Sequence, residues 1–120
     1  MNKKTLVLGA SSKPGRYSNL AIQKLVAKGF EVRAIGFRKG EVVGVEVFER
    51  PIWFDEIHTV SIYLNKNNQK EYYDYILSLN PKRVIFNPGS ENIDLELLLT
   101  KHKIFFERAC TLVLLSIGGY

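Results

Sequence analysis

The sequence has a single cysteine, Cys110, among 120 residues. One cysteine cannot form an internal disulfide framework, and this low usage is typical of a reducing compartment. No apolar run approaches the roughly 20 residues that a membrane span needs. The first residues lead directly into an apolar segment, without the features of a signal peptide. The sequence therefore predicts a cytoplasmic protein with no membrane partner.

A run of five or more basic residues is also missing, although the formal net charge is +5. A positive charge favours anionic partners, but it does not by itself separate a phosphorylated small molecule from a nucleic acid. The basic residues are spread along the chain and are not interleaved with aromatic residues at base-stacking spacing. These features favour a small anionic ligand and no nucleic-acid partner.

Clusters of metal-ligating residues are absent as well. Neither His58 nor His102 has a cysteine or carboxylate at metal-ligand spacing, so we predict no metal site. His102 is expected near a helix C-terminus, where a structural role is sufficient. No acidic residue follows the first apolar segment, at Leu8-Gly9-Ala10, which excludes a phospho-acceptor domain of similar topology.

What the chain does contain is a regular alternation of apolar segments and helical patterns. Its length and its hydrophobic content of 46% predict one globular domain over residues 1–120. The alternation predicts a single doubly wound α/β fold, with a mostly parallel, Rossmann-like sheet and helices on both faces. We expect strands at residues 4–9, 31–37, 45–48, 59–64, 83–86 and 103–106, and helices at 18–28, 69–79 and 92–101.

The sequence is less decisive about the ends of some elements and about two short segments. Ser18 is the expected N-cap of the first helix, and residues 40–44 are expected to form a turn-rich linker. Residues 53–57 fit either one helical turn or a loop. The apolar segment 109–115 fits either a helix or a strand by periodicity.

The segment between the first strand and the first helix has the composition of a phosphate-binding loop. Small residues at positions 9–12 let a phosphate approach the backbone closely. Ser11, Ser12 and Lys13 can donate hydrogen bonds to a diphosphate, and Arg16 adds a second full positive charge. The helix that follows contributes the positive end of its dipole.

Other loops are expected beside this one. In parallel sheets, ligands bind beyond the carboxyl ends of the strands, where the direction of winding reverses. If the strand at 59–64 lies beside the strand at 4–9, the loops at 9–17, 65–68 and 87–92 converge on one crevice.

The loop does not fit the NAD fingerprint. Of the three glycine positions, only Gly9 is kept, and Ser11 and Pro14 occupy the other two. The end of the second strand, at residues 36–39, has no carboxylate for the ribose hydroxyls. Arg38 and Lys39 stand there instead. They suit a ligand with an extra phosphate near its adenosine ribose, such as NADP or coenzyme A, or they are solvated turn residues.

Five segments resemble those of the small CoA-binding domain proteins, which are similar to the CoA-binding domain of the succinyl-CoA synthetase α-subunit. They are Gly9-Ala10-Ser11-Ser12-Lys13-Pro14-Gly15-Arg16-Tyr17-Ser18, Val43-Gly44-Val45-Glu46-Val47-Phe48, Val60-Ser61-Ile62-Tyr63-Leu64-Asn65, Asn87-Pro88-Gly89-Ser90-Glu91-Asn92 and Ala109-Cys110-Thr111-Leu112-Val113. The resemblance implies that Gly9, Ser11, Ser12, Lys13, Arg16 and Tyr17 surround the diphosphate and adenosine of CoA. It implies binding more than catalysis. The chain departs from the family at Ile35-Gly36-Phe37, where many relatives carry a Val-Asn-Pro-like segment.

We therefore predict non-covalent binding of coenzyme A or an acyl-CoA, with no catalytic residue. An NADP-dependent reductase is the alternative, but the sequence offers no proton donor that can be named and no second domain for a substrate. The pantetheine arm is expected to run toward residues 87–92. The predicted ligand-binding residues are Gly9, Ala10, Ser11, Ser12, Lys13, Arg16, Tyr17, Arg38, Asn65, Pro88 and Gly89.

Cys110 and Glu91 have competing interpretations. Arg108 could favour the thiolate form of Cys110 and permit a mixed disulfide with CoA, but we favour a small buried hydrophobe. Glu91 could act as a general acid or base, or it could stabilise a helix from its first turn, which explains it as well.

Three tyrosines lie close together in the helix expected at residues 69–79. The spacing of Tyr72 predicts a core position. Tyr73 and Tyr75 are predicted to be surface residues available for self-association, which makes a homodimer a hypothesis.

Overall fold

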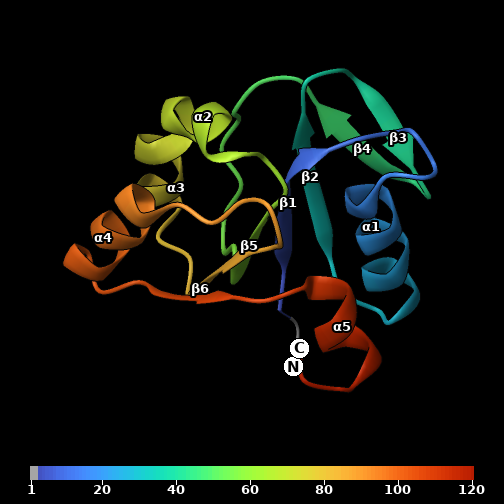
Figure 1. Cartoon of the computed structure of the whole chain (residues 1–120). Helices are drawn as coiled ribbons and strands as arrows, with labels where there is room; N and C mark the ends of the chain where they lie inside the picture. Colours follow the sequence, from blue (N-terminus) through green and yellow to red (C-terminus); the bar gives the residue numbers. More distant parts are fainter. Residues whose placement is uncertain (1–2) are drawn as a thin grey trace.

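The computed structural model describes residues 3–120, which fold around one seven-stranded sheet (Figure 1). The elements are β1 (Thr5–Ala10), α1 (Tyr17–Ala27), β2 (Val32–Gly36), β3 (Gly40–Val42), β4 (Val45–Phe48), β5 (Thr59–Ile62), α2 (Lys66–Gln69), η1 (Lys70–Tyr72), α3 (Tyr73–Leu79), β6 (Arg83–Phe86), α4 (Ile93–Lys101), β7 (Phe105–Arg108) and α5 (Thr111–Ser116).

The strand order is β3-β4-β2-β1-β5-β6-β7, and every neighbouring pair is parallel except β3 with β4. The predicted α/β fold with a mostly parallel sheet is confirmed. The chain first winds outward from β1 to β2 and β4, and then returns to β5 on the other side of β1. The winding therefore reverses between β1 and β5, the arrangement on which the expected convergence of loops depended.

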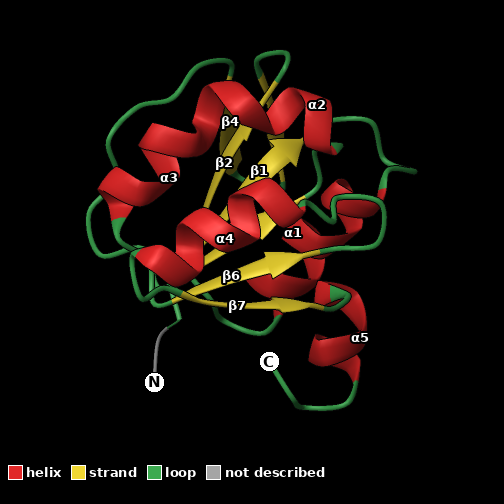
Figure 2. Cartoon of the chain, turned by 60° about the vertical axis from the view of Figure 1, so that its left-hand side comes forward, coloured by secondary structure: helices red, strands yellow, loops and turns green. Residues whose placement is uncertain are grey.

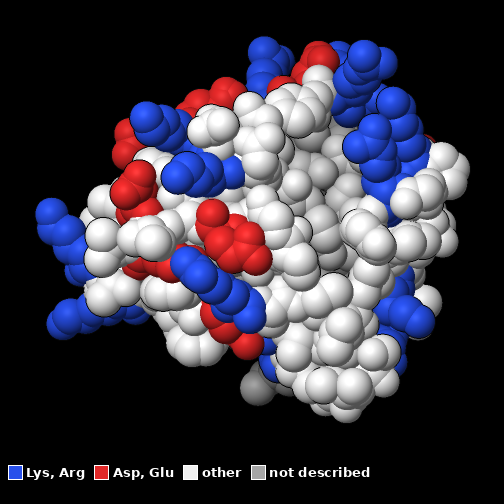
Figure 3. Space-filling model, viewed as in Figure 1, with Lys and Arg blue, Asp and Glu red and all other residues white. Residues whose placement is uncertain are grey.

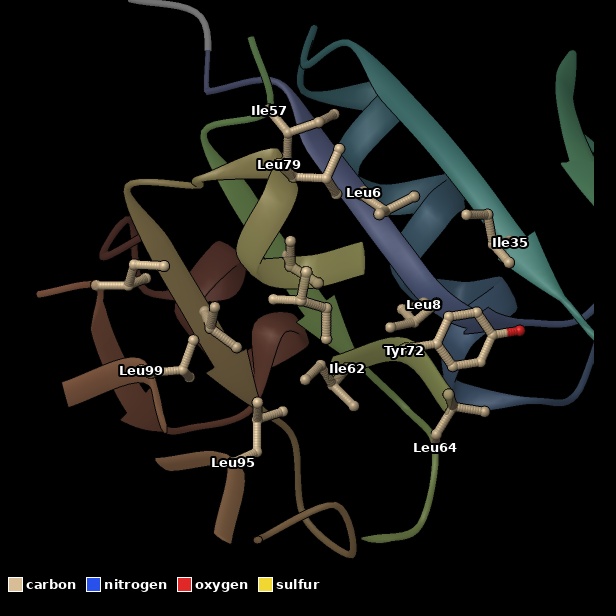
Figure 4. Close-up of a cluster of buried hydrophobic side chains, with 14 of the residues drawn as sticks. Leu6, Leu8, Ile35, Ile57, Ile62, Leu64, Tyr72, Leu79, Leu95 and Leu99 are labelled. Carbon is tan, nitrogen blue, oxygen red and sulfur yellow. The ribbon is translucent and has the colours of Figure 1, made fainter. Parts of the chain in front are cut away.

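Alternate residues of β1 enter two different hydrophobic clusters, as the period of two in a strand requires. Leu6 and Leu8 belong to the larger cluster, with Leu95 and Leu99 of α4 (Figure 4). Val7 belongs to the other cluster, together with Ile22 of α1 and Leu115 of α5. In Figure 1, α1 and α5 lie to the right of β1 and β2, and α3 and α4 lie to the left of β1, and Figure 2 shows α3 and α4 in front of the sheet. All residues of β1 except Gly9 are buried, as expected for a central strand.

Two glycines permit close backbone approach at the carboxyl end of β1. Gly9 has φ +97°, and a Cβ there would lie 3.0 Å from the amide nitrogen of Leu64. A Cβ on Gly36, at the end of β2, would lie only 2.1 Å from the main-chain oxygen of Ala10. Side chains at these positions would push apart the strands that frame the loop after β1.

The expected linker at residues 40–44 is instead part of a β-hairpin, so that prediction was wrong. Gly40–Val42 forms β3, which pairs antiparallel with β4. Val43 and Gly44 connect the strands with φ +42° and +85°. Positive φ at both residues of a two-residue connection is the geometry that a tight hairpin needs, but it is rare for a β-branched residue such as Val43.

Several element boundaries also differ from expectation. The first helix begins at Tyr17 with Arg16 as its N-cap, two residues before Ser18, the predicted cap. The last strand begins at Phe105 because Lys103, with φ +60°, is still in the turn after α4.

Two further segments are now assigned. The helix expected at residues 69–79 is divided into α2, η1 and α3, and it begins within the loop expected at residues 65–68. Residues 53–57 form no helix, and the apolar tail contains α5. No helix within residues 3–120 is both long enough and apolar enough to cross a membrane.

Candidate functional site: a basic cleft at the carboxyl ends of the strands

A cleft of about 530 Å³ opens where the winding of the sheet reverses. Its size is within the range of small-molecule and cofactor sites. It is lined by the segments that follow β1, β2, β5 and β6, namely by Gly9, Ala10, Ser11, Ser12, Lys13, Arg16, Tyr17, Ser18, Phe37, Arg38, Lys39, Tyr63, Leu64, Asn65, Asn68 and Pro88.

The loop after β1, residues 11–16, is held in shape by a few short hydrogen bonds. The Lys13 amide donates to Ser11 Oγ at 3.1 Å, and the Arg16 amide donates to the Lys13 carbonyl at 3.2 Å. The buried Asn19 side chain donates to the Ser11 carbonyl at 3.0 Å and fastens the loop to α1. Ser11 Oγ keeps its own proton for another acceptor, so it can still donate to a ligand.

The two longest helices begin in contrasting ways. The N-cap of α4 is Asn92, whose side chain accepts hydrogen bonds from two amides of the first turn, and Asp94 and Glu96 add negative charge there. The N-cap of α1 is Arg16, which accepts no such bond with its side chain, and the first turn of α1 contains no acidic residue. The positive end of the α1 dipole therefore meets the cleft without a compensating negative group from its own first turn.

Four basic residues line the cleft, Lys13, Arg16, Arg38 and Lys39, and its lining contains no acidic residue. Figure 3 shows Lys and Arg side chains gathered beside a hollow at the upper right of this face, over the segment after β1 and the β3–β4 hairpin. Lys39 lies 3.8 Å from Glu49 in an exposed ion pair. Within residues 3–120, the other three form no ion pair. Exposed like charges repel one another, so this arrangement is suited to an anion with several charges.

Aromatic side chains complete the lining. Tyr17 and Phe37 are 73% and 66% exposed, unusual values for large apolar side chains in a cleft. Tyr63 lies deeper, and burial raises the pKa of its hydroxyl to about 12, with a smaller contribution from nearby Cys110. At neutral pH this hydroxyl therefore remains protonated.

A buried polar network fixes the loops on the far side of the cleft. The fully buried Gln69 amide donates to the carbonyls of Leu64 and Ser90, at 2.9 and 2.7 Å. Asn87 donates to Ser61 Oγ and accepts from the Thr111 amide. Satisfied networks of this kind hold loops rigidly because each broken bond leaves a buried polar group unpaired.

The structure brings together ten of the eleven predicted ligand-binding residues. Gly89 is the exception: it lies outside the lining, and its amide donates to Glu91 Oε1. Asn65 lines the cleft, but its side chain caps α2 by accepting from the Asn68 amide. The predicted set omitted Ser18, Phe37, Lys39, Tyr63, Leu64 and Asn68. Phe37 and Tyr63 directly follow β2 and β5, so the rule that ligands bind at carboxyl ends could have found them.

Residues proposed for other chemistry lie outside the cleft lining. Arg108 donates to both carboxylate oxygens of Glu96, at 2.8 and 3.0 Å, and these bonds raise the pKa of its guanidinium. Arg108 is thus held by Glu96, contrary to its suggested role beside Cys110. Cys110 is the N-cap residue of α5 and is partly exposed, so the prediction of a buried thiol was wrong.

Glu91 was expected in the first turn of a helix. It lies instead before Asn92, the N-cap residue of α4. His102 follows α4 as its C-cap residue, as expected. The described residues contain no group of three or more His, Cys, Asp and Glu side chains that could hold a metal ion.

The tyrosines of the α2–α3 region are engaged within the chain. Tyr72 is buried, as predicted. The Tyr75 hydroxyl donates to the Ile52 carbonyl, and Asn92 donates to the Tyr73 hydroxyl. Both rings pack partly buried against the larger cluster, so neither is the free surface residue that the homodimer hypothesis assumed.

The fold and the cleft together define a mostly parallel α/β domain with a basic cleft beside its first strand. A family model for the CoA-binding domain matches residues 3–116, and the chain belongs to this family.

Among solved structures, an uncharacterized protein is 45% identical, with a TM-score of 0.96, over 100% of this chain and 99% of that one. A hypothetical protein from Pyrococcus horikoshii OT3 is 22% identical, with a TM-score of 0.83, over 92% of this chain and 79% of its own. The dinucleotide-forming acetyl-coenzyme A synthetase 1 of Ca. Korarchaeum cryptofilum, in complex with phosphate and ADP, is 18% identical, with a TM-score of 0.67. That match covers 83% of this chain and 23% of the synthetase. A search of curated proteins finds no match.

Proposed function

We propose that this protein binds coenzyme A or an acyl-CoA non-covalently in the basic cleft. The observation that carries the proposal is the start of α1. Its dipole is not offset by an acidic residue in the first turn, and Lys13 and Arg16, which form no ion pair within residues 3–120, lie directly before it. Amide groups at a helix N-terminus, supplemented by cations, form a site for phosphate.

In this proposal the diphosphate lies against the loop after β1. Ser11, Ser12 and the loop amides donate hydrogen bonds, and Lys13 and Arg16 neutralise the charge. Gly9 and Ala10 keep the backbone accessible because they present little or no side chain. The positions of these residues in the lining of one cleft support this assignment.

The 3′-phosphate of CoA is assigned to Arg38, with Lys39 beside it. Both follow β2 and lie on the same cleft as Lys13 and Arg16. Two basic groups on separate segments suit a ligand whose phosphates are at two separate places. Tyr17 and Phe37 are exposed on the same cleft and can pack against the adenosine.

The pantetheine arm would run past Asn65 and Pro88 toward residues 87–92. Gly89 is retained in this proposal as a residue next to the arm beyond the cleft lining. Tyr63 also lines the cleft, and with a pKa of about 12 its hydroxyl is poorly matched to proton transfer near neutral pH. This supports binding without chemistry, in contrast to an NADP-dependent reductase.

Three further predictions belong to the proposal. The two hydrophobic clusters that meet alternate residues of β1 support a doubly wound fold with helices on both faces of the sheet. The single cysteine supports a cytoplasmic location. The ligand is the only partner we assign.

The test is a calorimetric titration of one preparation with CoA, dephospho-CoA, NADPH and a short RNA. We expect CoA to bind and dephospho-CoA to bind about tenfold more weakly, because one charge-assisted contact is lost. Arg38→Ala should weaken CoA binding and leave dephospho-CoA binding nearly unchanged. A preference for NADPH would support the reductase instead, and binding of RNA alone would overturn both.

A further inference from the structure

The β3–β4 hairpin meets the loop after β1 where Gly40 lies beside Ser12. A Cβ on Gly40 would lie 2.9 Å from Ser12 Cβ and 3.0 Å from Ser12 Oγ. Carbon atoms in favourable contact are about 3.5–4.0 Å apart, so even one methyl group would not fit. The oxygen of Ser12 can rotate away, but its Cβ moves only with the backbone of the loop.

The need for glycine at position 40 arises from this contact alone. Gly40 is not among the residues with positive φ, so its backbone conformation is open to alanine. It pairs with Val47 across the hairpin in an ordinary antiparallel register. The hairpin could therefore accept alanine at this position, whereas the loop cannot without moving.

Gly40 also connects the two basic regions of the cleft. It directly follows Arg38 and Lys39, which line the cleft, and it touches Ser12, which precedes Lys13 on the other segment. The contact thus sets the separation between the loop after β1 and the segment after β2. A ligand that meets both segments depends on that separation.

We propose that Gly40 is a positioning residue of the ligand site. Through its contact with Ser12, Gly40 sets the position of the loop after β1. This inference rests on the proposed function, because it names the element that adjusts the same site to its ligand. Gly40 itself need not touch the ligand.

The experiment compares Gly40→Ala with two matched controls in CoA titrations and thermal melts. Gly15→Ala lies in the same loop but outside the cleft lining, with no atom within 4 Å of the added Cβ. Gly44→Ala lies in the same hairpin, again with open space, but at φ +85°, so it strains the hairpin without reaching the cleft. We expect Gly40→Ala to weaken CoA binding about tenfold, an effect within the range of overpacking by one methyl group. Neither control should weaken it comparably.

A double-mutant cycle with Ser12→Gly separates positioning from a general effect on the fold. Ser12→Gly removes both atoms that the new methyl group would meet. In that background, Gly40→Ala should cause no further loss of affinity and no further change in melting temperature. Equal losses in both backgrounds, or no loss in the wild-type background, would overturn the inference.

The NMR resonance of the Lys13 amide in the ligand-free protein tests, independently of CoA binding, whether Gly40 positions the loop after β1. Gly40→Ala should shift this resonance in the wild-type background and leave it in place in the Ser12→Gly background. If the wild-type protein does not bind CoA, the proposed function fails, and these resonances still show whether Gly40 positions the loop. An unmoved Lys13 amide would overturn the positioning role.

Discussion

The two ends of the parallel strands use the same residue types in opposite ways. At the amino ends, three basic residues are paired with carboxylates: Lys4 lies 3.1 Å from Asp55, Arg33 lies 2.7 Å from Glu31, and Arg83 lies 3.7 Å from Glu107. At the carboxyl ends, Lys13, Arg16 and Arg38 line a cleft without a single acidic residue. Both ends contain basic residues, but those named at the amino ends have acidic partners within the chain.

The difference separates charges that stabilise the fold from charges that remain for a ligand. Arg83 is 8% exposed, donates to Thr59 Oγ1 and lies over the Tyr120 ring, 4.3 Å from its centroid. A charge held in this way is part of the core. The basic residues of the cleft gain nothing comparable from the described chain, and a bound polyphosphate would supply the missing partner.

The largest change in stability is expected when a paired charge is removed. Arg83→Met should lower the free energy of unfolding by about 3 kcal/mol, because it leaves Glu107 without its cation and breaks the bond to Thr59. Affinity for CoA should be unchanged, since Arg83 begins β6, at the opposite end of the strand from the cleft. Urea unfolding and calorimetry measure the two quantities. A loss of affinity with unchanged stability would contradict the division between the two ends.

Removing two unpaired charges should have the reverse outcome. Lys13→Ala combined with Arg16→Ala should weaken CoA binding about a hundredfold, since each charge-assisted bond contributes about 1.5–3 kcal/mol before screening. The melting temperature should not change, because neither side chain forms an ion pair in the described part of the chain. Lys24→Ala with Lys28→Ala removes the same charge from exposed positions at the other end of α1. That control should leave affinity nearly unchanged, and collapse of the Lys13/Arg16 variant would show that these residues are structural.

The smallest effect concerns pH at the amino ends. Burial lowers the pKa of His58 below its ordinary value of 6.5, and Arg83, Lys3 and Lys82 lower it further. Between the lowered pKa and 6.5, the unfolded chain binds a proton that the folded chain does not, so stability should fall as the pH decreases through this window. His58→Gln should make unfolding less sensitive to pH there. Identical slopes in urea unfolding of the two proteins would contradict this assignment.

The sequence predicted the repeating part of the fold because that part follows from side-chain periodicity. Segments such as β1 and β5, which are buried throughout, appear as continuous apolar runs. The hairpin was missed because it depends on Val43 adopting a positive φ, for which no composition signal exists. The shift of β7 has a similar cause in the left-handed conformation of Lys103.

In the candidate site too, some features follow from the local sequence and others depend on contacts between distant segments. The small and polar residues at positions 9–12 predict a phosphate-binding loop through their own chemistry. Ten of the predicted residues do line one cleft. The requirement for Gly36 and Gly40 comes from neighbours distant in sequence, Ala10 and Ser12. Only packing reveals such requirements. The pairing of Arg108 with Glu96, which removed its supposed role beside Cys110, is equally a matter of tertiary contact.

The short outer strands have a consequence for self-association. β3 is three residues long, and β7 is four residues long with Glu107 and Arg108 in its sequence. Short, charged borders of this kind discourage another chain from adding its own strand to the ladder. If copies of this protein associate, they should do so through helical surfaces, and the sheet of each copy should remain a separate unit.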